Sequence, residues 1–201
     1  MSYTFVTTES TLMTDSKLIT DFRNGDIKAF NLLVERWQNR IHRFAYRYFA
    51  GHDEAMEITQ KTFIKVYKKL DTLEDSERFS TWLYQIVNNL CLDETKRAGR
   101  RRSVSMEVLK DHPVDEMPAA NPTQLIQKKE LGSILQLALK QLPPEQRIVV
   151  IMKEYEELKF REIAEILEEP ENTVKSRLYY GLRTLRTIFE QWNIEMEAYY
   201  E

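Results

Sequence analysis

The spacing of apolar residues constrains this fold most strongly, because it is helical along almost the whole chain. Between residues 27 and 49, apolar side chains recur in steps of three and four, which places them on one face of a helix. Only five glycines interrupt the 201 residues. The sequence therefore predicts an all-α protein, with helices expected at about 15–23, 27–49, 53–70, 80–99, 123–142, 144–155, 160–168 and 172–189. Asp26 and Ser80 are expected as N-caps of the helices that follow them.

One internal segment loses this period. Residues 103–122 contain Pro113, Pro118 and Pro122 and no aromatic residue, which is typical of a linker. A linker of about twenty residues can span roughly 70 Å. The sequence therefore predicts two small helical domains joined by a flexible linker. The expected order is a disordered N-terminus at 1–14, a domain at 15–100, the linker at 101–122, a domain at 123–192 and a tail at 193–201.

Basic charge is concentrated in two strips, although the net charge of the chain is −3. Residues 95–102 and 172–189 carry lysine and arginine but no acidic side chain. Phosphates are met by a local patch rather than by the net charge, so both strips are candidate DNA-binding surfaces. The first strip also suits the C-terminal end of a helix, and the second could be a solvated helix face.

The second strip lies in a helix-turn-helix pattern. A short helix at 160–168, a polar break at 169–171 and a longer basic helix follow one another, with Asn172 expected as the N-cap. At 100° per residue, one side of the longer helix is apolar and the other polar. This pattern favours binding in a major groove. The expected inward residues are Val174, Leu178, Gly181, Leu182 and Leu185; the outward ones are Thr173, Ser176, Tyr180, Arg183 and Thr187.

Several function classes are disfavoured by composition and motifs. A membrane-spanning helix needs about 20 apolar residues, and no run approaches that length. The single cysteine, Cys91, excludes an intramolecular disulfide, suits a reducing compartment and is expected to be a buried thiol. No metal-ligand cluster, glycine-rich phosphate loop or nucleophile–base pair is recognisable. The expectation is a cytoplasmic protein without membrane contact, catalytic residues, metal or cofactor.

Four segments, in this order, resemble the extracytoplasmic-function (ECF, group 4) sigma factors of bacterial RNA polymerase. ITQKTFIKVYKKLDTL at 58–73 resembles their polymerase-binding helix, and RFSTWLYQIVNNLCLDETKR at 78–97 their promoter-melting segment. LALKQLPPEQRIVVIMKEYEEL at 137–158 and FREIAEILEEPENTVKSRLYYGLRTLR at 160–186 resemble their C-terminal helices and helix-turn-helix. The resemblance covers roughly residues 15–190.

This resemblance implies a protein that binds core RNA polymerase and directs promoter-specific initiation. The first domain would melt the minus-ten element and hold it as single-stranded DNA, and the second would bind the minus-thirty-five element as duplex. Members of the family are often held inactive by an anti-sigma factor, which makes such an inhibitor a candidate partner. A stand-alone helix-turn-helix regulator is the alternative, and it predicts a homodimer with palindromic sites. The motif order in residues 53–97 argues against that alternative.

The family's binding residues map onto three sets in this sequence. Lys61 stands where the family usually has an acid, and Asn172 stands where glycine is common. Polymerase contacts are expected at Glu57, Gln60, Phe63 and Ile64. Minus-ten contacts are expected at Ser76, Phe79, Ser80, Thr81, Asn88, Asn89, Lys96, Arg97 and Arg100. Minus-thirty-five contacts are expected at Asn172, Thr173, Lys175, Ser176, Arg177, Tyr180 and Arg183.

Three aromatic residues in the promoter-melting segment, residues 78–97, could either pack in the core or stack on an unpaired base. Trp82 adjoins the apolar stripe of its helix, so packing in the core is favoured over stacking on an unpaired base. For Phe79 and Tyr84 the two roles remain open. A structure separates the readings directly, because a core aromatic is buried and a stacking aromatic is exposed.

Overall fold

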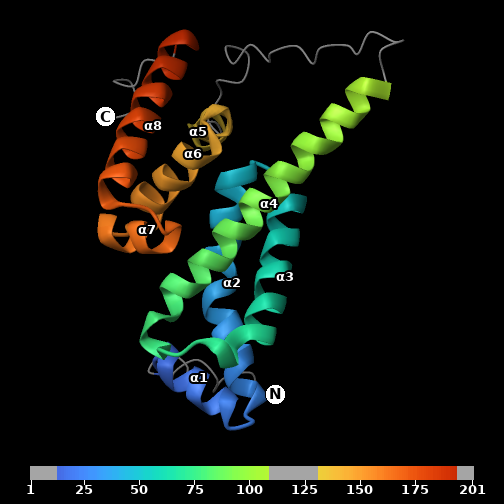
Figure 1. The fold of residues 1–201 in the computed structure, drawn as a ribbon, viewed down its shortest axis with the longest axis vertical. Coiled ribbons are helices and arrows are strands. Elements are labelled where there is room, and N and C mark those ends of the chain that lie inside the picture. Colours follow the sequence, from blue (N-terminus) through green and yellow to red (C-terminus); the bar gives the residue numbers. More distant parts are fainter. Residues whose placement is uncertain (1–12, 109–130, 194–201) are drawn as a thin grey trace, which may run out of the picture.

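Within the part of the chain that the structure describes, every regular element is a helix (Figure 1). The computed structural model describes the backbone of residues 13–108 and 131–193 and the side chains of 13–100 and 132–193. The helices form two groups, α1–α4 and α5–α8, so the all-α, two-domain prediction is confirmed. The elements are α1 (Asp15–Arg23), α2 (Ile27–Phe49), α3 (His52–Lys69), η1 (Leu70–Thr72), η2 (Ser76–Arg78), α4 (Phe79–Val108), α5 (Leu131–Gln141), α6 (Pro144–Val150), η4 (Ile151–Tyr155), α7 (Phe160–Leu167) and α8 (Glu171–Gln191).

The first group is built around α2. The Asp26 side chain caps this helix by accepting a hydrogen bond from the Lys28 backbone N–H at 2.9 Å, as the sequence predicts. The helix ends at Ala50, whose left-handed φ of 56° turns the chain into α3. Apolar residues of α2 pack against α1, α3 and α4 in one continuous core. Its fully buried members include Leu33, Ile41, Phe44 and Tyr48.

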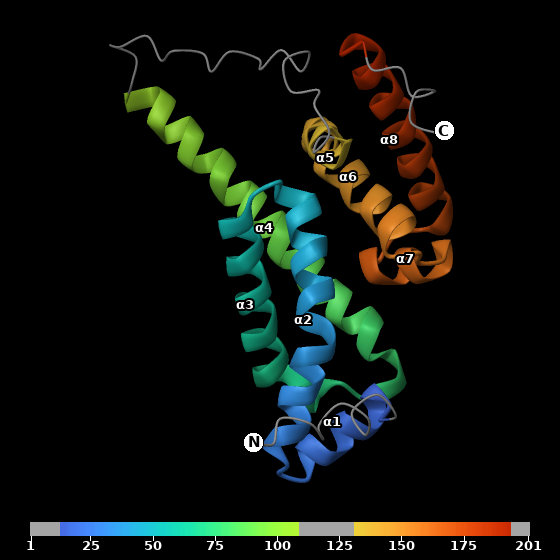
Figure 2. The same cartoon turned by 180° about the vertical axis from the view of Figure 1, so that it is seen from behind.

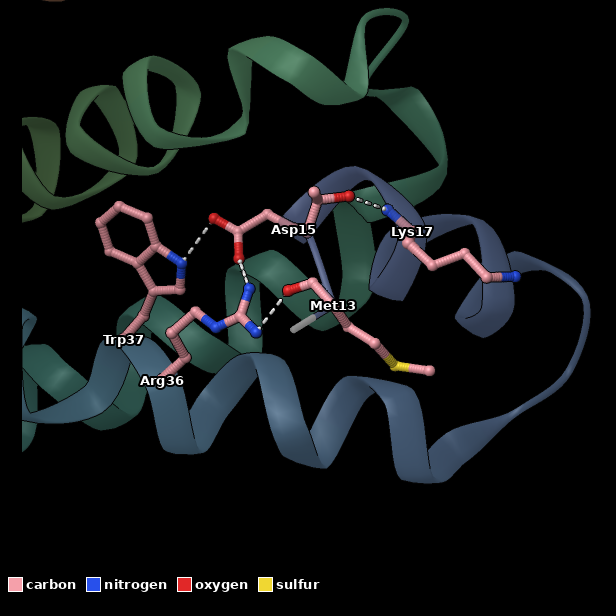
Figure 3. A network of polar contacts seen from close by, with 6 residues as sticks. Met13, Asp15, Lys17, Arg36 and Trp37 are labelled. Carbon is pink, nitrogen blue, oxygen red and sulfur yellow. Dashed lines mark hydrogen bonds and ion pairs between the residues drawn. The ribbon is translucent and has the colours of Figure 1, made fainter. Parts of the chain in front are cut away.

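Helix α1 is fastened to α2 by a polar network that begins before residue 15 (Figure 3). The Asp15 carboxylate accepts hydrogen bonds from Trp37 Nε1 at 3.0 Å and from Arg36 at 2.6 Å. Arg36 also donates to the carbonyl of Met13 at 2.6 Å, and Thr14 caps α1. The expectation of disorder at 1–14 is therefore wrong for these last two residues, and residues 1–12 lie outside the described chain.

Helix α4 is longer than the sequence predicts. It begins at Phe79, so Ser80 lies inside the first turn rather than at the cap, and it continues to Val108 instead of ending near Gly99. A single glycine within a helix costs only about 1 kcal/mol, and no proline follows until Pro113. The predicted linker therefore loses residues 101–108 to the helix, and its remaining part, 109–122, lies outside the described residues.

The second group packs the helix-turn-helix, α7 and α8, against α6. Pro143 occupies the N-cap position of α6 and Pro144 its first turn, where a missing N–H is tolerated. Helix α8 approaches α6 closely at Gly181, where an added Cβ would lie 2.9 Å from the Val150 side chain. Glycine is therefore required at this crossing.

The two groups also pack against each other. Figures 1 and 2 show α6 and α7 lying beside α2 and α4, and α7 contacts the first half of α4. One buried cluster includes Leu83 and Val87 of α4 together with Val149 and Met152 of the second group. The two domains are therefore positioned relative to each other by direct contact.

Candidate nucleic-acid interface

The outward face of α8 carries most of the residues predicted to bind duplex DNA. Ser176, Tyr180 and Arg183 are exposed, and Thr173 is half-buried in the first turn. Val174, Gly181 and Leu185 are buried on the opposite side, as the helical wheel predicts. Asn172 is exposed but is not the N-cap: the helix begins at Glu171 after Pro170, so Asn172 lies within the first turn.

The basic residues of α8 differ in their availability. Lys175 pairs with Glu171 at 2.6 Å, and Arg177 pairs with Glu169 at 3.0 Å. These acids lie just before the basic strip, so the strip is less positive than its own residues suggest. Arg183, by contrast, is exposed and has no ion-pair partner among the described residues. It is therefore the side chain of α8 most available to a phosphate or a base edge.

The wheel misplaces one residue of α8 and misses another. Leu182 is 44% exposed rather than inward, because Gly181 and Leu185 occupy the crossing with the neighbouring helices. Tyr179, 64% exposed, lies beside Tyr180 with ring centroids 5.7 Å apart. Its exposure adds an aromatic surface to the outward face of α8 that no sequence motif indicated.

The residues predicted for the minus-ten strand divide into buried and accessible sets. Phe79 is 1% exposed and packs edge-to-face on Trp37 at 5.9 Å, and Asn88 is also buried. Neither side chain reaches the surface in this conformation, and contact of Phe79 and Asn88 with DNA stays a prediction. Trp82 is half-buried against Phe79, and Tyr84 is buried, which settles its open reading for this conformation.

The accessible set lies in two places. Ser76, Ser80 and Thr81 are half-buried at the start of α4. They adjoin a hollow of about 290 Å³ that is lined by the 72–75 loop, Arg78 and Trp82 from the first group and Glu165 from α7. The other members, Asn89, Lys96, Arg97 and Arg100, are exposed farther along α4.

Helix α3 presents a mixed acidic and apolar face. Glu57, Gln60 and Ile64 are exposed as predicted, and Ile64 is 55% exposed. Phe63 is half-buried and packs on the core, because Ile58, Thr62 and Val66 form the buried stripe. Met56, 52% exposed, extends this face and carries no motif that would have identified it.

The unusual Lys61 lies between two acids on this face. Its ammonium group lies 2.5 Å from Glu57 and 3.6 Å from Glu94 of α4. A lysine at this position therefore joins α3 to α4 by charge. The pairing also places a cation next to Glu57, one of the predicted polymerase contacts.

A buried carboxylate, Glu156, joins the two groups and was not found from the sequence. Its side chain is 3% exposed and accepts hydrogen bonds from Arg40 Nε at 2.7 Å and from the Tyr84 hydroxyl at 2.6 Å. Burial, and then the neighbouring Glu156 charge, raises the pKa of Tyr84. Burial, the largest single effect, lowers the pKa of Arg40, but hydrogen bonds and charge interactions with Glu156 and Tyr84 together raise this pKa above its ordinary value.

The described residues offer few other reactive or metal-binding groups. Cys91 is fully buried, as expected, and burial raises the pKa of its thiol, which leaves the unreactive neutral form. Within residues 13–108 and 131–193, no group of three or more histidine, cysteine or acidic side chains is placed to hold a metal ion. No helix among these residues is both long and apolar enough to cross a bilayer.

Two family models match the chain. Sigma-70 region 2 matches residues 33–101, and Sigma-70 region 4 matches residues 133–185. The chain is 31% identical over 175 residues to the ECF RNA polymerase sigma factor SigW of Bacillus subtilis, covering 85% of this chain and 94% of SigW. It is 33% identical over 172 residues to the ECF RNA polymerase sigma-E factor of Escherichia coli K12, covering 83% of this chain and 90% of that protein.

A third relative is longer than this chain. The ECF RNA polymerase sigma factor SigE of Mycolicibacterium smegmatis is 38% identical over 160 residues, which cover 79% of this chain and 60% of SigE.

Two solved structures share the fold. The sigma factor RpoE of Bartonella quintana, solved with the anti-sigma factor NepR, matches with a TM-score of 0.64 and 22% identity over 82% of this chain and 98% of RpoE. CnrH, solved with the cytosolic domain of CnrY, matches with a TM-score of 0.63 and 19% identity over 88% of this chain and 97% of CnrH.

Proposed function

Because this chain belongs to the ECF sigma factors of bacterial RNA polymerase, we propose that it binds core RNA polymerase and directs it to specific promoters. The observation that carries the proposal is that both sigma-70 regions match this chain in order, and that α3, α4 and α8 each present exposed side chains among the predicted contact residues. The role is binding and strand stabilisation rather than bond chemistry, and the site of action is the cytoplasm.

The outward face of α8 is the proposed reader of the minus-thirty-five element. An exposed arginine can bond a guanine edge with two hydrogen bonds, and Ser176 and Tyr180 flank it with neutral donors. Lys175 and Arg177 serve phosphates after releasing Glu171 and Glu169. Arg183 is therefore proposed as the principal specificity residue of this half.

The hollow at the start of α4 is the proposed site of the melted minus-ten strand. Extruding a base costs a few kcal/mol, which stacking and backbone contacts offset. Trp82 lines the hollow and offers a ring, and Thr81 offers a hydroxyl. Lys96, Arg97 and Arg100, exposed on later turns of α4, are placed to follow the phosphate backbone.

The outward face of α3 is the proposed polymerase-binding surface. Exposed apolar side chains beside acids and amides are typical of protein–protein contacts rather than of DNA contacts. Met56 and Ile64 would supply apolar area, and Glu57 and Gln60 would supply polar contacts. Because RpoE of Bartonella quintana was solved with the anti-sigma factor NepR and CnrH with the cytosolic domain of CnrY, an inhibitory protein is also a proposed partner.

The experiment for this proposal is a pull-down with purified core RNA polymerase followed by run-off transcription from a genomic library. A stoichiometric complex and discrete start sites are expected. Duplex binding without polymerase binding would instead favour the stand-alone regulator, which would also have to be a homodimer. An Arg183→Ala variant should retain the polymerase complex and lose the start sites.

A further inference from the structure

Helix α1 is fixed against α2 by buried apolar side chains and by the polar network of Figure 3. Leu18 and Ile19 are buried in the core that α1 shares with α2. The Asp15 carboxylate accepts hydrogen bonds from Arg36 at 2.6 Å and from Trp37 at 3.0 Å, both residues of α2. Burial of apolar area and bonds to a charged acceptor both stabilise this placement. The C-terminal end of α1 therefore has a defined position within the first group of helices.

The last residue of α1, Arg23, is bonded to a turn that is distant in the sequence, residues 70–75 (the 70–75 turn). Its Nη2 group donates a hydrogen bond to the Leu70 carbonyl at 2.9 Å and another to the Leu73 carbonyl. The Leu73 backbone N–H donates to the same Leu70 carbonyl at 3.2 Å. One guanidinium thus connects α1 to the first residue of η1 and to the residue that follows η1.

An arginine suits this position because the carbonyls at the end of a helix lack partners within that helix. Helix α3 ends at Lys69, and the chain leaves regular helical bonding after η1. A guanidinium carries its N–H donors in a rigid plane, and bonds from a charged donor are roughly twice as strong as neutral ones. Arg23 itself is exposed at the end of its helix. Removing its donors should therefore loosen the 70–75 turn without unfolding α1.

The 70–75 turn has a buried side and an exposed side. Leu70 and Leu73 are buried in the core, and η2, which follows the turn, contacts α1. The exposed residues of the turn line the hollow of about 290 Å³ at the start of α4, together with Trp82; they are Thr72, Glu74 and Asp75. The backbone of this wall is thus bonded to α1, while the side chains that line the hollow remain exposed.

We propose that Arg23 is a positioning residue for the melted minus-ten strand, because it holds the 70–75 turn in the form that accepts an extruded base. The inference rests on the function proposed above, which takes the hollow as the minus-ten site. Arg23 acts through the backbone of Leu70 and Leu73 and does not touch the DNA. A turn that is ordered before binding loses little conformational entropy when the strand arrives, so the complex is tighter and more selective.

The first experiment measures the turn itself in the full chain, without DNA or polymerase. Arg23→Met keeps an unbranched side chain and removes both donors. Amide hydrogen exchange in residues 70–78, relative to peptides of α8, should become about tenfold faster, because loss of two charge-assisted bonds eases local opening. Arg23→Lys, which keeps a charged donor, should restore part of the protection. Lys28→Met is the matched control, since it removes one exposed cation from the neighbouring helix α2. Unchanged exchange in Arg23→Met, or equally faster exchange in Lys28→Met, would overturn the positioning role.

The second experiment measures selectivity in the complex of the full chain with core RNA polymerase. Two labelled single strands are compared, one with a mapped minus-ten sequence and one with the same bases scrambled. If the 70–75 turn keeps its binding form in about one-tenth of Arg23→Met molecules, affinity for the mapped strand should fall about tenfold. Affinity for the scrambled strand and for a minus-thirty-five duplex should not change.

The same comparison separates positioning from direct contact. Equal losses for the mapped and the scrambled strand would make Arg23 a phosphate contact and would overturn the proposal. Arg23→Lys should recover part of the affinity for the mapped strand only. A complex of the unmutated chain that does not prefer the mapped strand would contradict the proposed function of the hollow, whereas the exchange measurement decides independently whether Arg23 holds the turn.

Discussion

The two surfaces proposed to bind DNA differ in how far their side chains are exposed. The outward face of α8 is open, and Ser176, Tyr180 and Arg183 face solvent on a formed helix. The start of α4 is partly buried: Phe79 lies in the core, and Glu165 of α7 reaches across to Arg78. A preformed, exposed helix can enter a duplex groove without rearrangement, whereas at the start of α4 the exposed Arg78 is already paired with Glu165.

This difference teaches that similar sequence signals can have opposite structural meanings. Aromatic and polar residues near a basic strip indicate DNA contacts in both halves. In α8 most of them are exposed, and in the first turns of α4 several of them hold the core together. Substitutions in each half can test whether a given residue contacts DNA or packs in the core.

The largest expected effect is on stability, at Phe79. Truncating a fully buried phenylalanine removes apolar contacts and leaves a cavity, so Phe79→Ala should lower the free energy of unfolding by about 3–5 kcal/mol. Arg183→Ala, at an exposed position, should change it by less than about 0.5 kcal/mol. Urea denaturation measures both. Unchanged stability of Phe79→Ala with weakened single-strand binding would restore Phe79 as a DNA contact.

The next effect is on duplex binding. Arg183→Ala should weaken binding of a minus-thirty-five duplex by about 1–3 kcal/mol, because an arginine–guanine contact is lost. Fluorescence anisotropy measures the change. Arg186→Ala is the control: Arg186 is exposed on the same helix but pairs with Glu190 at 2.9 Å. Equal losses for the two variants would mean that α8 binds by charge alone, with a salt slope of about 0.9 per phosphate.

A smaller effect is expected on the outward face of α3. Ile64→Ala should weaken binding of core polymerase by about 1–2 kcal/mol, since an exposed apolar side chain that becomes buried contributes in that range. Lys68→Ala, exposed one turn farther along α3, should leave polymerase affinity unchanged. Competition binding with labelled polymerase compares the two. A stronger loss for Lys68→Ala would move the contact surface off the proposed face.

The smallest effect is a pH dependence carried by Tyr84. Its pKa is raised in the folded chain by burial and by Glu156, while Arg40 and Arg47 face the same carboxylate. Below the ordinary phenol pKa of about 10 the contribution of Tyr84 is fully present, and it is lost as pH rises through the folded-state pKa. Between pH 10 and 10.5, the unfolding free energy should fall more steeply than in Tyr84→Phe, by about 0.7 to 1 kcal/mol per pH unit, because the phenol is half to three-quarters ionised in the unfolded chain and still protonated in the folded one. Parallel pH profiles for the two proteins would contradict the buried Tyr84–Glu156 bond.

The helices themselves could be predicted well, because they follow from local spacing. The apolar stripe of α2 and the Asp26 cap were confirmed, and so were the buried Val174, Gly181 and Leu185 of α8. Helix ends were harder, because α4 continues through Gly99 when nothing beyond it stops the helix. Local spacing fixes which face of a helix is apolar, but not how far the helix extends.

The interface between the groups could not be predicted, because it depends on contacts distant in sequence. Glu156 lies in an acidic stretch that looks like a solvated surface, yet its partners Arg40 and Tyr84 bring it into the interior. The same folding buries Phe79, whose family position pointed to DNA. Glu156 follows the buried Val149 and Met152 at helical spacing, but spacing alone does not show that a glutamate at the end of such a stripe will find buried partners.

The most direct test of the central claim is to mix the full chain with core RNA polymerase and a mapped promoter and to follow both complex formation and run-off transcription. The account predicts a one-to-one complex and discrete start sites, with Arg183→Ala retaining the complex and losing the start sites. Duplex binding by a chain that neither joins core polymerase nor supports any defined transcript would contradict it.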